Sequence, residues 1–290
     1  MERLDVLKTY KLYINGAFPR TESGRSIALK NTRGKVIAHI CHGSRKDLRN
    51  AVEAARAAQE KWAGRDAYNR GQILYRMAEM MEGKRDEFAE AIRVTGGATA
   101  AAARKEVAAS IDRLVCFAGW CDKFAQVLGG HNPVAGPHYN FTIPEPTGVV
   151  GVVAPDEPAL LGLITLIGPA ICAGNTVVAI ASQKHPLPAA VFGEVCATSD
   201  VPSGVVNIIT GKRAELLEHL ARHREVDAIS AANLRKNQAA ILRAGMAENL
   251  KRVSVRKLNA DDWHDADAGE SPWAIEPVVE MKTIWHPSAS

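Results

Sequence analysis

The sequence predicts an α/β protein built on a doubly wound parallel sheet, and the second half of the chain provides the evidence. From residue 148 onward, short apolar segments of strand length alternate with segments of helical pattern. Neighbouring parallel strands need a crossover connection, which a helix usually supplies. The expected strands are Val149–Val153, Thr176–Ile180, Val205–Ile209, Ala228–Ala231 and Val253–Lys257. The expected helices are Leu160–Ala173, Pro188–Thr198, Ala214–His223 and Leu234–Ala247.

Residues 1–137 are expected to add small strands and then helices to this sheet. Alternating apolar and polar residues with Asn-Gly and Arg-Gly turns predict short antiparallel strands between residues 10 and 40. Ser44 is a suitable N-cap for a first helix. Apolar residues at helical spacing predict a second long helical region over residues 66–94 and a third helix over residues 98–128.

Two segments outside the sheet are expected to form a β arm. Residues 138–147 alternate in polarity and then break at two prolines, which favours an exposed strand. Residues 278–290 contain a last strand-like run, VVEMKTIW. The sheet unit, residues 148–260, is joined to this run by residues 261–277, which are acidic and rich in turn formers. We interpret that stretch as a linker.

Composition excludes several classes of protein. The hydrophobic fraction of 47%, the charged fraction of 23% and the net charge of +4 are ordinary for a globular protein, and no basic stripe indicates nucleic-acid binding. The most apolar run is interrupted by prolines and acids, which favours a buried strand–helix unit over a membrane span. The first residues lack the apolar core of a signal peptide, so a cytoplasmic location is expected.

Cysteines and histidines give no sign of a metal site. The five cysteines are scattered, which predicts reduced thiols in place of a disulfide framework. Cys116 and Cys121 are not at metal-ligand spacing. His219 and His223 are four residues apart on an expected helix, but no third ligand accompanies them. No metal is therefore expected.

Seven segments occur in an order that is informative when they are taken together. They are Tyr13–Phe18, Asn31–Ile40, Ala51–Trp62, Arg70–Ile92, Glu145–Pro155, Ile167–Val178 and Val201–Gly211. In this order they resemble the aldehyde dehydrogenase superfamily. The resemblance implies a Rossmann-like nucleotide domain, a catalytic domain and a small oligomerisation arm, with NAD(P)-dependent oxidation of aldehydes as the family activity.

The positions that carry the family's chemistry are altered. Asp156 replaces the oxyanion-binding Asn of a Pro-Trp-Asn-Phe-Pro type motif, and a carboxylate accepts hydrogen bonds where a donor is needed. Arg256 stands where the resemblance places the general base, and no Cys follows Cys196 to act as a nucleophile. The resemblance therefore implies a member that lacks the catalytic domain and has no catalytic residues.

The positions implied to hold the cofactor are also degenerate. Ile180, Ser182 and Gln183 fall in the segment that resembles Lys-Pro-Ser-Glu, whose Lys and Glu hold the adenosine ribose in the family. Asn233 follows the fourth strand, where the family seats the pyrophosphate, and we interpret it as a helix cap. No cofactor is therefore expected, and weak NAD(P) binding is left as an alternative.

The leading hypothesis is a non-catalytic subunit that assembles with an active aldehyde dehydrogenase, or with itself, and supports it. It resembles the degenerate second unit of the family-16 type aldehyde dehydrogenases. The arm would form the interface, because exposed strand edges invite pairing, and the missing domain would leave an apolar face for a partner to cover. The expected interface residues are Tyr139, Phe141, Ile143, Met281, Thr283 and Trp285.

Two other functions are left open by the sequence. One is a dinucleotide-binding regulator that keeps a weakened pocket. The other is an aldehyde dehydrogenase with a rearranged active site. Neither a nucleic acid nor a membrane is expected as a partner.

Overall fold

The centre of the protein is a parallel sheet whose strands appear in the order β10-β9-β6-β7-β8. A computed structural model describes residues 6–288. All neighbouring pairs in this sheet are parallel, which confirms the predicted fold class. The strands are β6 Val149–Val153, β7 Thr176–Ile180, β8 Val206–Ile209, β9 Ala228–Ala232 and β10 Arg252–Arg256.

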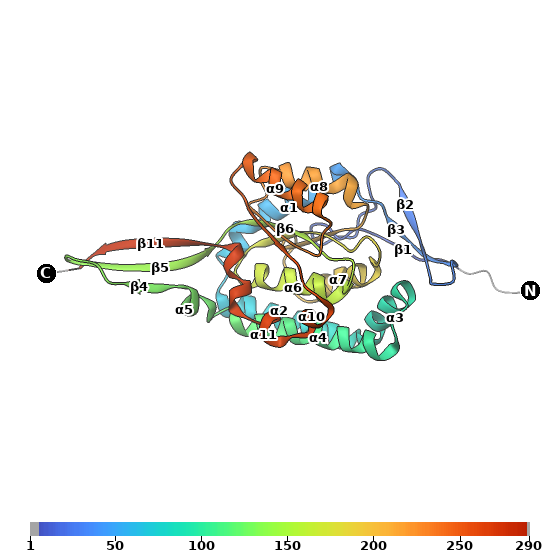
Figure 1. Ribbon diagram of the computed structural model, residues 1–290, viewed down its shortest axis with the longest axis horizontal. Coiled ribbons are helices and arrows are strands. Elements are labelled where there is room, and N and C mark those ends of the chain that lie inside the picture. Colours follow the sequence, from blue (N-terminus) through green and yellow to red (C-terminus); the bar gives the residue numbers. More distant parts are fainter. Residues whose placement is uncertain (1–5, 289–290) are drawn as a thin grey trace, which may run out of the picture.

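Helices cover both faces of the sheet because the strands carry apolar side chains on both sides. On β6, Val149 and Val153 pack with one apolar cluster, while Val150 and Val152 pack with the other. Helices α1 and α8 lie over the first face, and α2, α4, α6 and α7 over the second (Figure 1). The crossover helices are α6 Ala159–Cys172, α7 Leu187–Thr198, α8 Arg213–Arg222 and α9 Lys236–Ala244, followed by the 3-10 turn Gly245–Glu248.

Helix α1, Arg45–Ala63, begins as expected at Ser44, which forms a capping box with Asp47. The second helical region is not continuous, because it breaks at Lys84 into α2, Ala67–Gly83, and α3, Arg85–Gly96. The third region also divides, into α4, Ala100–Trp120, and α5, Phe124–Leu128. Apolar spacing alone could not locate these breaks, since the stripe continues through both of them.

The N-terminal strands are β1 Thr9–Tyr10, β2 Ser26–Lys30 and β3 Val36–Cys41. The pair β2–β3 is antiparallel as predicted. The pair β1–β3 is parallel, so the expectation of antiparallel pairing was wrong for β1. The chain after β1 is held by the backbone of Tyr13, which exchanges hydrogen bonds with Ile208 on the edge strand β8.

A three-stranded arm extends from one end of the molecule (Figure 1). It consists of β4 Gly130–Asn132, β5 His138–Pro146 and β11 Val279–Pro287, in the order β11-β5-β4. Strand β5 continues through Pro144 and Pro146, where the sequence predicted a break. Both prolines are tolerated because β4 pairs only as far as Thr142, so one edge of β5 is open beyond that residue.

The segment expected to be a linker is folded. Residues 260–278, called the strap below, form two short helices, α10 Ala260–His264 and α11 Ala266–Gly269, and the 3-10 turns Pro272–Ala274 and Glu276–Val278. Trp263 and Ile275 are fully buried. The buried guanidinium of Arg113 donates to Thr165 and to the carbonyl of Trp263. The strap therefore covers part of the apolar face that we expected a partner to cover.

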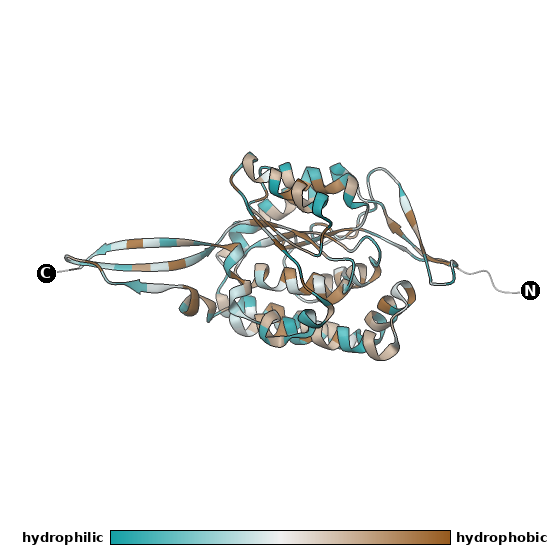
Figure 2. Ribbon diagram, viewed as in Figure 1, coloured by the Kyte–Doolittle hydropathy of each residue, from teal (hydrophilic) through white to brown (hydrophobic). Residues whose placement is uncertain are grey.

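Hydropathy follows this architecture (Figure 2). The central strands β6 and β7 are mostly apolar, whereas the arm strands alternate between hydrophobic and hydrophilic residues. Among residues 6–288, no helix combines the length and the apolar character that crossing a membrane requires.

Candidate functional site

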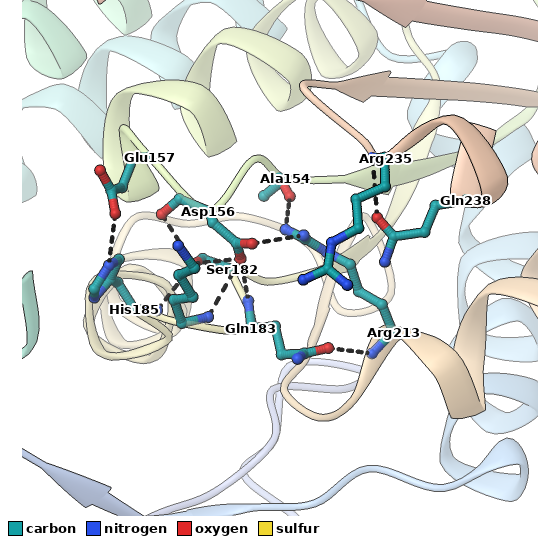
Figure 3. A network of polar contacts seen from close by, with 10 residues as sticks. Ala154, Asp156, Glu157, Ser182, Gln183, His185, Arg213, Arg235 and Gln238 are labelled. Carbon is teal, nitrogen blue, oxygen red and sulfur yellow. Dashed lines mark hydrogen bonds and ion pairs between the residues drawn. The ribbon is translucent and has the colours of Figure 1, made fainter.

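The candidate site lies at the carboxyl ends of strands β6, β7 and β9, called the carboxyl edge below, where open parallel sheets usually bind ligands. Asp156 follows β6 and points toward the turn that follows β7 (Figure 3). Its Oδ1 accepts the backbone N–H groups of Gln183 at 3.0 Å and of Lys184 at 3.3 Å. Its Oδ2 pairs with Arg213 Nη1 at 3.0 Å.

Arg213 completes this network from the first position of helix α8. Its side chain is 4% exposed and also donates to the carbonyl of Ala154 at the end of β6. Its backbone N–H donates to Gln183 Oε1 at 2.9 Å, which satisfies one unpaired amide of the helix N-terminus. The cation, the carboxylate and the amide side chain are all engaged within the chain.

The charge on Asp156 is stabilised where it lies. Burial acts to raise the pKa of this carboxyl, but Arg213 and the two backbone N–H groups outweigh it and hold the pKa below its usual value. Burial lowers the pKa of Arg213, and the neighbouring carboxylate opposes that effect. An ionised Asp156 that only accepts hydrogen bonds cannot supply a donor to an oxyanion.

The structure brings together only some of the residues that were expected at the cofactor positions. Ser182 donates to the backbone of Asp156 and lies beside Gln183, as Figure 3 shows. Ile180 is fully buried in the core at the end of β7 and reaches no site. Asn233 does not cap helix α9, so that interpretation was wrong. Its side chain instead exchanges two hydrogen bonds with the backbone of Leu258, and its φ of 52° places it in the left-handed region.

Arg256 ends the edge strand β10, two strands away from β6. Its side chain is partly buried, and this burial lowers the pKa of the guanidinium. A guanidinium of this kind stays protonated in proteins. It cannot take a proton from water, so the position expected for the general base holds no base.

The cysteines are not poised for nucleophilic attack. Cys41, Cys121, Cys172 and Cys196 are buried, and only Cys116 is partly exposed. Burial raises the pKa of the Cys116, Cys172 and Cys196 thiols. A thiol with a raised pKa is protonated at neutral pH and is a poor nucleophile.

The histidine pair gives no metal centre. Within residues 6–288, no group of three His, Cys, Asp or Glu side chains is placed to hold an ion. His223 Nδ1 instead accepts the backbone N–H of Glu225.

The dinucleotide implied by the resemblance does not fit the residues at this edge. Ile180 offers no polar atom, and Gln183 Oε1 is already bonded to Arg213. Asp156 places a negative charge beside the remaining space, which measures about 410 Å³ and is also lined by Lys184 and Arg235. The two cations could attract a phosphate, but the groups that would fix a ribose are missing or engaged.

Sequence reasoning missed Arg213, which is the central cation of this network. An acidic residue directly after a buried strand does indicate that a cation lies nearby. The sequence offered no way to choose Arg213, since it lies far along the chain from Asp156.

Comparison with known proteins agrees with this fold. Residues 20–257 match the model of the aldehyde dehydrogenase family. The mitochondrial 10-formyltetrahydrofolate dehydrogenase of Mus musculus is 33% identical over 85% of this chain and 27% of its own length. The mitochondrial benzaldehyde dehydrogenase of Antirrhinum majus is 32% identical over 84% of this chain and 46% of its own length.

Solved structures agree as well. The NAD+ complex of an aldehyde dehydrogenase from Bacillus cereus superposes with a TM-score of 0.81 at 26% identity, over 86% of this chain and 51% of that one. The chain thus spans about half the length of such structures. Only residues 257–278 separate β10 from β11, so a catalytic domain is absent between them. The chain belongs to the aldehyde dehydrogenase family.

Proposed function

We propose that this chain is a non-catalytic member of the family that associates through its arm with an active aldehyde dehydrogenase, or with a second copy of itself. The altered positions at the carboxyl edge support the first half of this proposal. Asp156 and Arg213 bind each other, Arg256 stands at the place of a base, and four of the five thiols are buried. The family's route through a thiolate, a base and an oxyanion donor has no residues to carry it.

The geometry of the arm supports the second half. Met281 lies opposite Pro144 in the antiparallel pair, and proline has no N–H to donate. In an antiparallel pair, the N–H and C=O groups of two opposed residues either bond to each other or both point away from the partner strand. We therefore infer that Met281 directs its N–H and C=O outward. The contact of Arg252 with the carbonyl of Val279, which lies opposite Pro146, fits the same register.

This register extends along the outer edge of the arm. Thr283 and Trp285 follow Met281 at steps of two residues, so their N–H groups also face outward. Strand β11 is the edge strand of its sheet, and a partner strand could be added along it. Met281, Thr283 and Trp285 are the three residues of β11 that the sequence led us to expect at an interface. This outward row is the observation that carries the assembly proposal.

The other three expected interface residues lie on the opposite face of the arm. Directly opposed residues of two paired strands point to the same face. The partners of Met281, Thr283 and Trp285 on β5 are Pro144, Thr142 and Asn140. The residues between them on β5, which are Tyr139, Phe141 and Ile143, therefore point to the other face. Tyr139 is 50% exposed and packs between the rings of His131 and Phe141. One face of the arm is thus aromatic, and the other carries Trp285, which is 59% exposed. A partner that adds to the edge would contact both faces.

Affinity purification from the native cell tests the proposal. We expect a full-length aldehyde dehydrogenase to co-purify with the tagged chain, and aldehyde-dependent NADH formation to be confined to that partner. The chain by itself should form no NADH. Isolation of the chain as a monomer in the presence of such a relative would contradict the assembly role. Aldehyde oxidation by the purified chain would contradict the non-catalytic role.

A further inference from the structure

A second cavity lies beside the carboxyl edge, between helices α3 and α4 and the strap. Its volume is about 470 Å³, within the range of small-molecule pockets. The strap contributes Trp263 and His264 to the wall. The match to the family model ends at residue 257, so this wall belongs to a part of the chain outside that match.

The charge of this cavity differs from that of the whole protein. The chain has a net charge of +4, yet the residues lining the cavity include the carboxylates Glu106, Glu157 and Asp261 and no lysine or arginine. His185 Nε2 lies 3.2 Å from Glu157. Burial, helped by Lys105 and Arg113, lowers the pKa of His264, which favours its neutral form. The lining is therefore acidic.

Glu106 is the most informative of these residues because it is only 9% exposed. Its Oε1 accepts the backbone N–H groups of Leu160 at 2.8 Å and Leu161 at 3.2 Å, at the start of helix α6. Pro158, at the N-cap of that helix, has no side chain that can cap it. Capping of helix α6 therefore accounts for the hydrogen bonds of one carboxylate oxygen of Glu106, Oε1.

The second oxygen of Glu106 is not explained by capping. Among the described residues, none donates a hydrogen bond to Oε2, although an ionised carboxylate can accept several. Burial raises the pKa of Glu106, with the two backbone N–H groups acting against it. A cation in the cavity would stabilise the charge on this carboxylate.

The rest of the lining is largely apolar, with Ile92, Ala102, Pro158, Leu258 and Trp263 among its residues. We propose that this cavity binds a small organic cation, with its ammonium group on Glu106 Oε2 and its apolar body against Trp263 and the neighbouring aliphatic side chains. The proposal concerns a site that the subunit role does not use. Either one can therefore fail without the other.

Calorimetry with three probes of similar shape tests the charge preference. Benzylamine, benzyl alcohol and sodium benzoate are titrated separately into the full chain at neutral pH. We expect benzylamine to bind, benzyl alcohol to bind at least about tenfold more weakly, and benzoate to give no heat. Absence of binding by benzylamine at millimolar concentration, or equal binding of all three, would overturn the proposal.

Two variants locate the site. Glu106→Gln keeps an oxygen that can cap α6 but removes the charge, and it should weaken benzylamine binding at least about tenfold. Ala102→Trp fills the cavity from an exposed position on α4 and leaves Glu106 unchanged, and it should abolish binding. Glu218→Gln, on the exposed face of α8, is the matched control and should bind as the original chain does. Unchanged binding in both cavity variants would refute the assignment.

Discussion

The carboxyl edge of the sheet and the outer edge of the arm differ in how their polar groups are satisfied. At the carboxyl edge, Asp156, Gln183 and Arg213 bond to one another and to the backbone. Along β11, the inferred register directs the N–H groups of Met281 and Thr283 away from the rest of the arm. Buried polar groups need partners, so a region whose polar side chains are largely bonded to one another has little to offer a ligand. An open strand edge, by contrast, is available to another chain.

The largest expected effect comes from breaking the internal network. Arg213→Ala should lower the free energy of unfolding by about 3–5 kcal/mol, because it leaves Asp156 partly buried without its cation. Urea unfolding measures this change. Arg222→Ala, at an exposed position of the same helix, is the control and should stay within about 0.5 kcal/mol of the original. If the two variants are equally stable, the network is not structural.

A smaller effect is expected when the family's own residue is restored. Asp156→Asn should destabilise the chain by about 1–3 kcal/mol, since Arg213 keeps only uncharged acceptors. We expect no aldehyde-dependent NADH formation, because nucleophile and base are still missing. A gain of such activity in a spectrophotometric assay would show that the carboxyl edge is closer to an active site than proposed.

Acid should weaken the same network. The folded pKa of Asp156 lies below its ordinary value of 3.8, so its contribution to stability is present above that value. The contribution is lost as the pH falls through the folded pKa, where Asp156 takes up a proton in front of Arg213. The stability difference between the original chain and Asp156→Asn should therefore shrink as the pH falls below about 4. A difference that stays constant over this range in urea unfolding would rule out an ionised Asp156.

The smallest effect on stability is expected in the arm. Trp285→Ser changes an exposed side chain and should alter the free energy of unfolding by no more than about 0.5 kcal/mol. The same variant should weaken association, as measured by sedimentation velocity over a concentration series. Strong destabilisation would mean that Trp285 serves the fold and not an interface.

Titration with the cofactor tests the carboxyl edge without involving the arm. Titration of NAD or NADP at millimolar concentration should give no heat with the original chain, because Ile180 offers no polar atom to a ribose and Gln183 Oε1 is bonded to Arg213. Saturable binding would support the regulatory alternative.

The parts of the fold that were predictable depend on local patterns. Strands β6 and β7 are mostly apolar and flanked by turns, so both were located to the residue. Ser44 marked the start of α1 because its cap is formed within one turn. The strap was missed because Trp263 and Ile275 are single apolar residues in a polar stretch, and their burial depends on helices far away in the sequence.

The site was less predictable than the fold. The sequence indicated that Asp156 replaces a donor, but the pairing with Arg213 joins two turns that only the sheet brings together. Asn233 was interpreted as a cap because its type favours one, and its bonds to Leu258 could not be foreseen. The expected interface residues of the arm lie at alternate positions, yet their division between two faces required the register of β5 and β11.

Native mass spectrometry of the chain, co-expressed with a full-length aldehyde dehydrogenase from the same cell, tests the central claim most directly. The critical variant is Thr283→Pro, which removes an outward N–H from β11, with Thr283→Ala as the control that keeps it. The account predicts a mixed oligomer, or an oligomer of this chain, that persists in Thr283→Ala and is lost in Thr283→Pro. A chain that stays monomeric, or an oligomer that Thr283→Pro leaves intact, would contradict it.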